Sequence, residues 1–270
     1  MQHFHHHPRN TAYQSIIHGR HTPTLPQLDV YFNADVSHWA SIGQGQDVKQ
    51  ILVLSFDDGQ GQVARGLSEN GFNGKVGGGK WVDGRFGQAL KFDGEDDFFE
   101  VYDAPELRLP EAGTLMAWAF IKGEKGHPSL PRIIIIKSNT NGGSHGYDFL
   151  FDRNAGYSLR FCVGGDCDSH FPLELKTRYH LAAAFDGKKI HIYVNGDEVG
   201  KRAQLGDSID TADLVIHIGN SPNRQRQFQG VLDEIRIFSL ALTKGDIVWH
   251  MERGSFEVFP VTLNGKVTTT

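Results

Sequence analysis

The sequence predicts an all-β protein, a two-sheet antiparallel β-sandwich with one short helix toward its C-terminal end. Three observations support this prediction. The 270 residues include 32 glycines and 18 phenylalanines, short apolar runs alternate with turn residues roughly every 8–12 positions, and long helical patterns are scarce. Because all-β sandwiches often exceed roughly 200 residues as one unit, we expect a single domain with irregular ends.

Segment 228–238 is the predicted centre of the sandwich, because its period-two alternation predicts a strand. One face of this strand would carry Asp233, Ile235 and Ile237. The other face would carry Leu232, Glu234, Arg236 and Phe238. Apolar residues on both faces are typical of a strand that is covered on both sides. A buried ionised carboxylate must be paired, hydrogen-bonded or bound to a metal, which makes Asp233 a candidate ion ligand.

The other strands are predicted from short β-branched and aromatic runs that Gly, Asn-Gly or Asp-Gly turns separate. Four isoleucines in a row at 133–136 are expected to be buried on both faces. Residues 68–79 and 166–170 are predicted to be loops. The further predicted strands are 51–56, 89–92, 98–101, 114–121, 147–151, 157–163, 179–185, 190–194 and 214–218.

The ends of the chain differ from this pattern. Prolines interrupt residues 1–49, which are expected to be a poorly ordered arm before the domain at 50–254. Thr243 begins a segment that resembles a capping box and predicts one short helix to Met251. Residues 255–270 are expected to form a C-terminal tail.

The charge and the hydropathy pattern exclude two classes of partner. The net charge is −5 and no block of Lys and Arg stands out, so no nucleic-acid partner is expected. No apolar stretch is long enough to cross a bilayer, so no membrane insertion is expected. No signal-peptide-like run is visible near Met1.

The two cysteines, Cys162 and Cys167, flank the turn sequence Val-Gly-Gly-Asp and face each other across a predicted hairpin. A disulfide between them would indicate an exported protein, located outside the cell or at its surface. Two reduced thiols in a cytosolic hairpin are the alternative.

Five segments carry a resemblance to a known family. They are Leu54-Ser-Phe-Asp-Asp-Gly, Trp81 to Val101, Gly113-Thr-Leu-Met-Ala-Trp, His180 to Gly196, and Gly230-Val-Leu-Asp-Glu-Ile-Arg-Ile-Phe. In this order they resemble the laminin-G-like, concanavalin A-like jelly-roll domains of the lectin/glucanase superfamily. The resemblance implies two antiparallel sheets packed face to face, a secreted or surface protein, a structural calcium ion and glycan-binding relatives.

The resemblance also implies a calcium site. It maps the carboxylate ligand to Asp233 and backbone carbonyl ligands to Asp57 and Gly87, and ligation by oxygen atoms alone suits a hard cation such as Ca²⁺. The alternative is that Asp233 accepts backbone N–H groups or pairs with Arg85 or Arg236.

The segment Glu95-Asp-Asp97-Phe-Phe-Glu100 has the Glu-x-Asp-x-x-Glu spacing of family-16 glycoside hydrolases. Retaining chemistry needs two carboxylates about 5–5.5 Å apart on one face of a cleft. Here a bulge would be needed to bring Glu100 to the face of Glu95, and Asp96 stands where those enzymes have an apolar residue. We therefore interpret the spacing as a coincidence and expect no catalytic residue.

The polar loops 139–147, 166–170 and 220–226 could form a binding surface at the rim of a sheet. Residues of types that hydrogen-bond to sugars or stack on them are Tyr147, Asp148, Asn220, Asn223 and Arg226. The sequence therefore predicts a non-catalytic carbohydrate-binding or adhesion module whose partner is a glycan or a cell-surface or matrix protein. The alternatives are a structural protein-interaction domain and, less favoured, a glycoside hydrolase.

Overall fold

The computed structural model describes residues 50–255, apart from residues 124, 126, 128, 140–145, 153–155 and 204–212 and the side chains of 166, 168–170 and 201–203. The predicted arm at 1–49, the tail after Ser255 and most of the predicted loop 139–147 lie outside the described residues. No helix in the described part of the chain is long and apolar enough to cross a bilayer.

Short strands dominate the described part of the chain. They are β1 (Gln50–Leu54), β2 (Val63–Ala64), β3 (Gly74–Gly77), β4 (Lys80–Asp83), β5 (Gln88–Asp93), β6 (Phe98–Val101), β7 (Gly113–Ile121), β8 (Arg132–Lys137), β9 (Tyr147–Asp152), β10 (Ser158–Val163), β11 (Asp166–Pro172), β12 (Thr177–Phe185), β13 (Lys189–Val194), β14 (Asp197–Ala203), β15 (Ile216–Ile218) and β16 (Gln229–Phe238). The helices are the 3-10 helix η1 (Pro105–Leu107) and α2 (Lys244–Met251).

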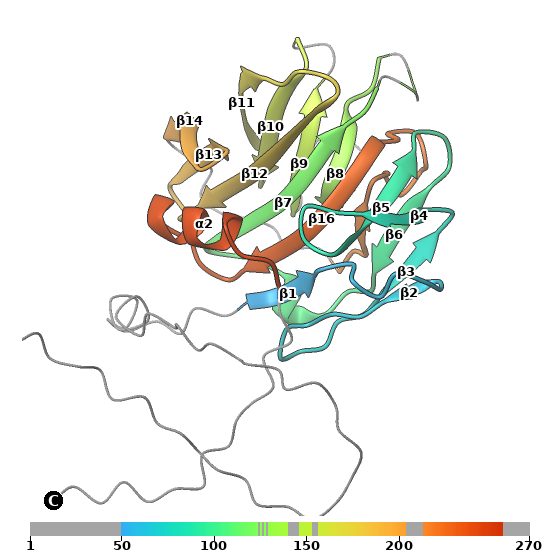
Figure 1. The fold of residues 1–270 in the computed structure, drawn as a ribbon. Helices are drawn as coiled ribbons and strands as arrows, with labels where there is room; N and C mark the ends of the chain where they lie inside the picture. The colour runs from blue at the N-terminus through green and yellow to red at the C-terminus, as the bar shows by residue number, and fades with distance from the viewer. Residues whose placement is uncertain are drawn as a thin grey trace, which may run out of the picture. The chain divides into compact units, whose positions relative to one another are not determined.

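The strands form two antiparallel sheets, which confirms the predicted sandwich (Figure 1). We call one of them the back sheet, a name that does not refer to the view in Figure 1. It has the strand order β14-β13-β12-β7-β16-β5-β4, with β1 paired to β16. The front sheet has the order β11-β10-β9-β8-β15-β6-β3-β2. We call the face of each sheet that points away from the other sheet its outer face.

The main core lies between the two sheets and contains rings from both. Phe161 on β10 and Phe185 on β12, for example, stack with centroids 6.0 Å apart. The isoleucine run on β8 is buried on both faces, as predicted: Ile134 and Ile135 join the main core. Ile133 and Ile136 form a separate cluster with Leu150, which is placed on the outer face by a bulge in the pairing of β8 with β9.

Strand β16 is central, but its predicted alternation is wrong. Leu232, Ile235 and Ile237 all belong to the main core, so the side-chain pattern shifts by one residue between Leu232 and Ile235. The cause is a bulge between Asp233 and Arg236 in the pairing with β7, where Glu234 has φ +51°. Asp233 therefore lies on the outer face of the back sheet, opposite the side of the two isoleucines.

The outer face of β16 is buried in part by α2 (Figure 1). Phe238 packs there in one apolar cluster with Met116, Ala182, Leu242 and Ile247. The helix begins with the predicted capping box, because the Thr243 hydroxyl accepts from the Asp246 N–H and the Asp246 carboxylate accepts from the Thr243 N–H. Both faces of β16 are thus covered, as the sequence predicts.

The bulge also orders the end of the described chain. Arg236 is buried, and its guanidinium donates to the Glu234 carboxylate at 2.7 Å and to Ser255 Oγ at 3.1 Å. The same guanidinium contacts His250 Nδ1 on α2 at 2.7 Å. Since the Ser255 N–H donates to Glu234, this buried network holds the segment after α2 against β16.

Two segments that the sequence predicts as loops contain strands. Residues 166–170 lie in β11, and Gly74–Gly77 form β3 although 68–79 are predicted to be loop. Both strands contain few β-branched residues, so the propensity signal is weak and pairing with a neighbouring strand decides their conformation. Cys162 and Cys167 pair directly across the β10–β11 hairpin and form the predicted disulfide.

Candidate functional site

The predicted ligand-binding residues Tyr147 and Asp148 are neighbours on β9, so their side chains point to opposite faces of the front sheet. Tyr147 is part of the main core and only 1% exposed. Its hydroxyl donates to the carbonyl of Leu107 at 3.1 Å. The ring of Tyr147 therefore offers no surface on which a sugar could stack.

Asp148 is fully buried on the outer face, and within the described residues neither of its carboxylate oxygens has a hydrogen-bond partner. Burial raises the pKa of Asp148 to about 6. The nearby Ser138 hydroxyl, although it donates to the carbonyl of Asn139 and not to Asp148, and the guanidiniums of Arg226 and Arg160 act in the opposite direction. Arg226 thus lies close enough to Asp148 to stabilise its charged form.

The remaining predicted residues lie in the loop between β15 and β16. Asn220 is fully buried, and its amide donates to the carbonyl of Asp97 at 3.2 Å. Asn223 is exposed and accepts from Ser221 Oγ at 2.7 Å. Arg226 is half-buried. The loop therefore combines one anchoring residue, Asn220, with two residues that reach the surface.

Asp148 belongs to a row of residues that crosses the outer face of the front sheet. Successive cross-strand pairs place Cys162, Asp148, Ile136, His217 and Glu100 side by side on β10, β9, β8, β15 and β6. Burial lowers the pKa of His217, whose Nδ1 lies 3.3 Å from the Glu100 carboxylate. The row is polar at Asp148, His217 and Glu100 and apolar between them.

Arg224 connects the loop after β15 to this row. Its guanidinium pairs with the Glu100 carboxylate and lies over the Phe98 ring, 3.4 Å from the centroid. Its backbone has φ +59°, a conformation that a non-glycine residue adopts at some energetic cost. We call Glu100, His217, Asn223, Arg224 and Arg226 the front-face cluster. The sequence does not predict Glu100, His217 or Arg224 as binding residues, because the strand register that brings them together is not visible in a sequence.

The three residues of the predicted calcium site gather at one turn, residues 84–88 between β4 and β5. Asp233 Oδ2 accepts from the N–H groups of Arg85 and Phe86 at 2.6 and 3.2 Å. Asp57 Oδ1 accepts from the Gln88 N–H at 2.8 Å. The carbonyl of Gly87 accepts from Gly84 within the turn. Hydrogen bonding to the backbone, the alternative from the sequence, is thus present at Asp233.

These residues also fit an ion in one respect. Asp233 Oδ1 is buried and has no hydrogen-bond partner among the described residues, so one carboxylate oxygen is available. Burial raises the pKa of Asp233 to about 7, against the effect of the Phe86 and Arg85 N–H groups. A Cβ at Gly84 would lie 2.5 Å from Asp233 Oδ2, and one at Gly87 would lie 1.9 Å from Asp57 Oδ1. Only glycines let both carboxylates approach the turn so closely; calcium at this turn stays a prediction.

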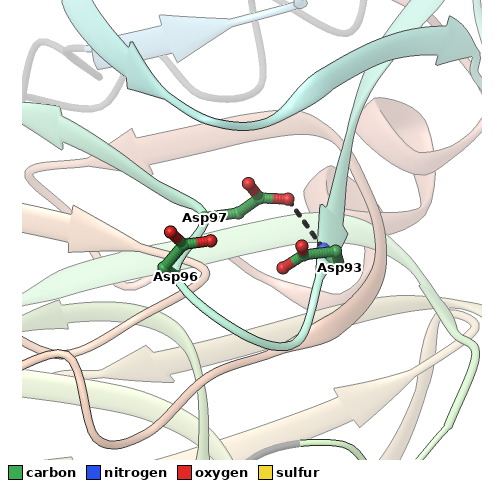
Figure 2. Close-up of side chains that lie close together, drawn as sticks. All are labelled: Asp93, Asp96 and Asp97. Atoms are coloured by element: carbon green, nitrogen blue, oxygen red, sulfur yellow. Dashed lines mark hydrogen bonds between the residues drawn. The ribbon is translucent and has the colours of Figure 1, made fainter.

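A second group of carboxylates lies in the turn between β5 and β6 (Figure 2). Oxygen atoms of Asp93, Asp96 and Asp97 lie within 4.8 Å of one another. Asp97 Oδ2 accepts from the Asp93 N–H at 2.8 Å, and Asp97 is buried. Burial raises the pKa of Asp97, and the carboxylates of Asp93 and Asp96 raise it further. The hydrogen bond from the Asp93 N–H lowers it. Oxygen donors of this kind could accept a hard cation.

The structure separates the residues of the glycosidase-like spacing. Glu95 pairs with Lys125 at 2.7 Å, Asp97 is hydrogen-bonded within its own turn, and Glu100 pairs with Arg224 on the outer face of the front sheet. Each carboxylate therefore has its own partner. The arrangement does not present Glu95 and Glu100 to one bond of a substrate.

Comparison with known proteins identifies the family. The family model described as the concanavalin A-like lectin/glucanases superfamily matches residues 93–248. No curated protein matches the sequence.

Similar solved structures share the fold at low sequence identity. The binding domain of Paraclostridial Mosquitocidal Protein 1 has a TM-score of 0.61 and 15% identity over 74% of this chain and 51% of that one. Domain 4 of AbnA, a GH43 extracellular arabinanase from Geobacillus stearothermophilus, was solved in complex with arabinotriose. It has a TM-score of 0.58 and 18% identity over 76% of this chain and 99% of that one. The binding domain of botulinum neurotoxin serotype G has a TM-score of 0.59 and 14% identity over 75% of this chain and 51% of that one. The chain thus spans about half the length of the two toxin domains.

Proposed function

Because the chain belongs to the concanavalin A-like lectin/glucanase superfamily, we propose that it is a non-catalytic carbohydrate-binding or adhesion module that binds through the front-face cluster. The observation that carries this proposal is the arrangement of Arg224. Its side chain is 35% exposed, and its guanidinium is paired with Glu100 and stacked on Phe98. Nη1 of the same guanidinium is buried and has no hydrogen-bond partner among the described residues. A charged donor that is already fixed in place loses little side-chain entropy when it binds a ligand.

A sugar suits this cluster chemically. Its hydroxyl groups can accept from the guanidiniums of Arg224 and Arg226 and donate to the carboxylate of Glu100. Phe98 is partly exposed beside Arg224 and offers an apolar surface to the C–H face of a sugar ring. The complex of AbnA domain 4 with arabinotriose supports the choice of a glycan as ligand.

The separate ion pairs of Glu95 and Glu100 support a binding role over glycoside hydrolysis. A retaining glycosidase needs two carboxylates about 5–5.5 Å apart and free to reach one glycosidic bond. A cell-surface or matrix protein is the second candidate partner, because exposed Asn223 and partly exposed Arg226 could equally hydrogen-bond to a protein surface.

Two further features belong to this proposal. The disulfide Cys162–Cys167 supports export, to the outside of the cell or its surface. A calcium ion held by the Asp233 carboxylate, with Asp57 and the Gly87 carbonyl, would stabilise the turn that joins β4 to β5. The free oxygen of Asp233 supports such an ion.

A glycan array run with the protein and with Arg224→Ala tests the proposal. We expect the parent to bind a defined set of glycans and the variant to bind them at least about tenfold more weakly, since a hydrogen bond from a charged group contributes about 1.5–3 kcal/mol. Arg253→Ala is the matched control, because Arg253 also stacks on an aromatic ring, Trp249, and lies near an acid, Glu252. Equal binding by both variants and the parent would exclude the front-face cluster as the site.

A further inference from the structure

The outer face of the back sheet carries a second row of residues that the proposed function does not use. Cross-strand pairs place Lys80, Lys91, Val231, Phe120 and Arg178 side by side on β4, β5, β16, β7 and β12. We call these five residues the basic row. Four strand spacings of about 4.8 Å give it a length of roughly 19 Å.

Alternation along the strands fixes the direction in which the basic row points. Leu90 and Phe92, on either side of Lys91, belong to the core between the sheets. Ala119 and Ile121, on either side of Phe120, belong to it as well. The basic row therefore points away from the core. Helix α2 covers another part of this face, over Met116, Ala182, Ala184 and Phe238.

The cations of the basic row lack acidic partners. Among the described residues, Lys80, Lys91 and Arg178 form no ion pair, and Lys80 and Arg178 are exposed. Elsewhere on the surface, cations do have such partners: Arg65 pairs with Asp58, Lys125 with Glu95, and Lys244 with Asp197. Other exposed lysines that have no ion pair in the described part of the chain, such as Lys188 and Lys189, lie outside the basic row.

Lys80 and Lys91 are also direct cross-strand neighbours. Like charges at directly opposed positions of two strands destabilise a sheet by a few tenths of a kcal/mol to about 1 kcal/mol. Folding alone would favour a neutral or acidic residue at one of the two positions. A pair of this kind indicates that the positive charge serves something other than stability.

Arg85 adds a further cation beside the row. Its guanidinium lies 5.1 Å from the ring centre of Trp118 and 4.9 Å from that of Phe86. Arg178 donates to the carbonyl of Gly84 at 3.0 Å, so both arginines are held near the turn at 84–88. Both arginines lie close to Trp118, Phe120, Val231 and Asp233 on this face.

This part of the face contains a donor without an acceptor. Trp118 Nε1 is buried and has no hydrogen-bond partner among the described residues. Asp233 lies near the row and accepts from the N–H groups of Arg85 and Phe86. Asp93 lies two residues from Lys91 on β5. Three cations thus stand in the basic row although the whole chain has a net charge of −5.

The geometry points to a linear polysaccharide that carries carboxylate or sulfate groups as the ligand of this face. Cations stand at both ends of the basic row, and partly exposed Phe120 and Val231 lie between them, as an extended chain of sugar rings with spaced acidic groups requires. A nucleic acid, with one charge per about 1.7 Å of duplex, would need a denser array of cations. The inference extends the proposed sugar-binding function to a second surface and does not depend on the front-face cluster.

Binding of three probe polymers to the full chain tests this inference: heparin, polygalacturonate and neutral dextran. We expect the protein to bind heparin, polygalacturonate or both, and not to bind dextran. Comparison of heparin with polygalacturonate separates recognition of sulfate from recognition of carboxylate. The double variant Lys80→Gln with Lys91→Gln should bind at least about tenfold more weakly at low salt. Its affinity should also depend less steeply on salt, because fewer counterions are released.

Lys188→Gln with Lys189→Gln is the matched control, because it removes the same charge from two exposed lysines at the β12–β13 turn. The inference predicts parental binding for this control and for Arg224→Ala, which reports on the front-face cluster alone. Equal weakening by both lysine pairs would show non-specific attraction and overturn the inference, as would binding of dextran. Tighter binding of duplex DNA or anionic vesicles through the same lysines would overturn the choice of ligand.

Discussion

Two buried carboxylates, Asp148 and Asp233, lie on the outer faces of the front and back sheets. Burial raises the pKa of Asp148 to about 6 and that of Asp233 to about 7, from 3.8. A carboxyl group whose pKa is raised by folding holds its proton more tightly in the folded state. Each group therefore favours folding most at pH values below 3.8, and this contribution is lost as the pH rises through the folded pKa.

Asp148→Asn is expected to reduce the pH dependence of stability. In the parent, ionisation of Asp148 should lower the free energy of unfolding by up to about 3 kcal/mol between pH 4 and pH 7, because a pKa difference of one unit corresponds to about 1.4 kcal/mol. The asparagine cannot ionise, so its stability relative to the parent should increase with pH in this range. Urea unfolding at a series of pH values measures the difference.

Asp152→Asn is the control for this measurement. Asp152 lies on the same strand but is only partly buried and pairs with Arg160. We expect the control to keep the pH profile of the parent near pH 6. Parallel profiles for Asp148→Asn and the parent would mean that the Asp148 carboxylate is solvated or paired in solution.

At the scale of elements, the turn between β4 and β5 depends on residues that are distant in sequence. Asp57 follows β1 and Asp233 lies on β16, and both bind backbone N–H groups of the turn. Gly84 and Gly87 allow this approach, since a Cβ at either position would collide with a carboxylate. The conformation of the turn is therefore determined by strands β1 and β16 as well as by its own glycines.

Calcium should raise the melting temperature by binding to the folded state, with a shift that grows with the logarithm of its concentration. Asp233→Asn should abolish this shift, because the amide keeps an acceptor for the turn but loses the charge that a hard cation needs. Asp83→Asn, which changes an exposed acid at the end of β4, should keep it. An unchanged calcium response in Asp233→Asn would leave Asp233 as a backbone cap only.

The strands could be predicted where the local signal and the tertiary environment agree. The isoleucines of β8 and the alternating β7 are apolar enough to be identified without a structure. The bulge at Glu234 could not be predicted, because its cause is the pairing with β7 and the buried network with Arg236. Since one inserted residue reverses the alternation, the period-two pattern predicts the wrong face for Asp233.

At the scale of the whole molecule, the two outer faces differ in chemistry although they belong to one acidic chain. The front sheet places Asp148, His217 and Glu100 in one row, and the back sheet places three cations in another. The sequence gives no indication of a basic face, because Lys80 and Arg178 come from strands that are far apart along the chain. Net charge therefore says little about where a charged ligand can bind.

The predicted ligand residues show the same limit. Sequence can identify residue types that bind sugars, but it does not separate buried Tyr147 and Asn220 from the more accessible Asn223 and Arg226. Burial depends on which strand covers a side chain, and that is set by long-range pairing. The hairpin disulfide could be predicted, because its two cysteines are separated by a single turn.

Removal of residues 1–45 tests the N-terminal boundary of the domain. The sequence of this segment is polar and interrupted by prolines, so it offers little apolar area to bury. The shortened chain should keep a cooperative thermal transition within a few degrees of the parent.

A chain that begins at residue 57 is the control, since it lacks β1. Leu52 and Leu54 of β1 are fully buried against Ile237 and Ile235 of β16. We expect the control to lose cooperative unfolding, because removing two buried leucines costs several kcal/mol. Loss of cooperativity already on removal of residues 1–45 would place that segment inside the fold.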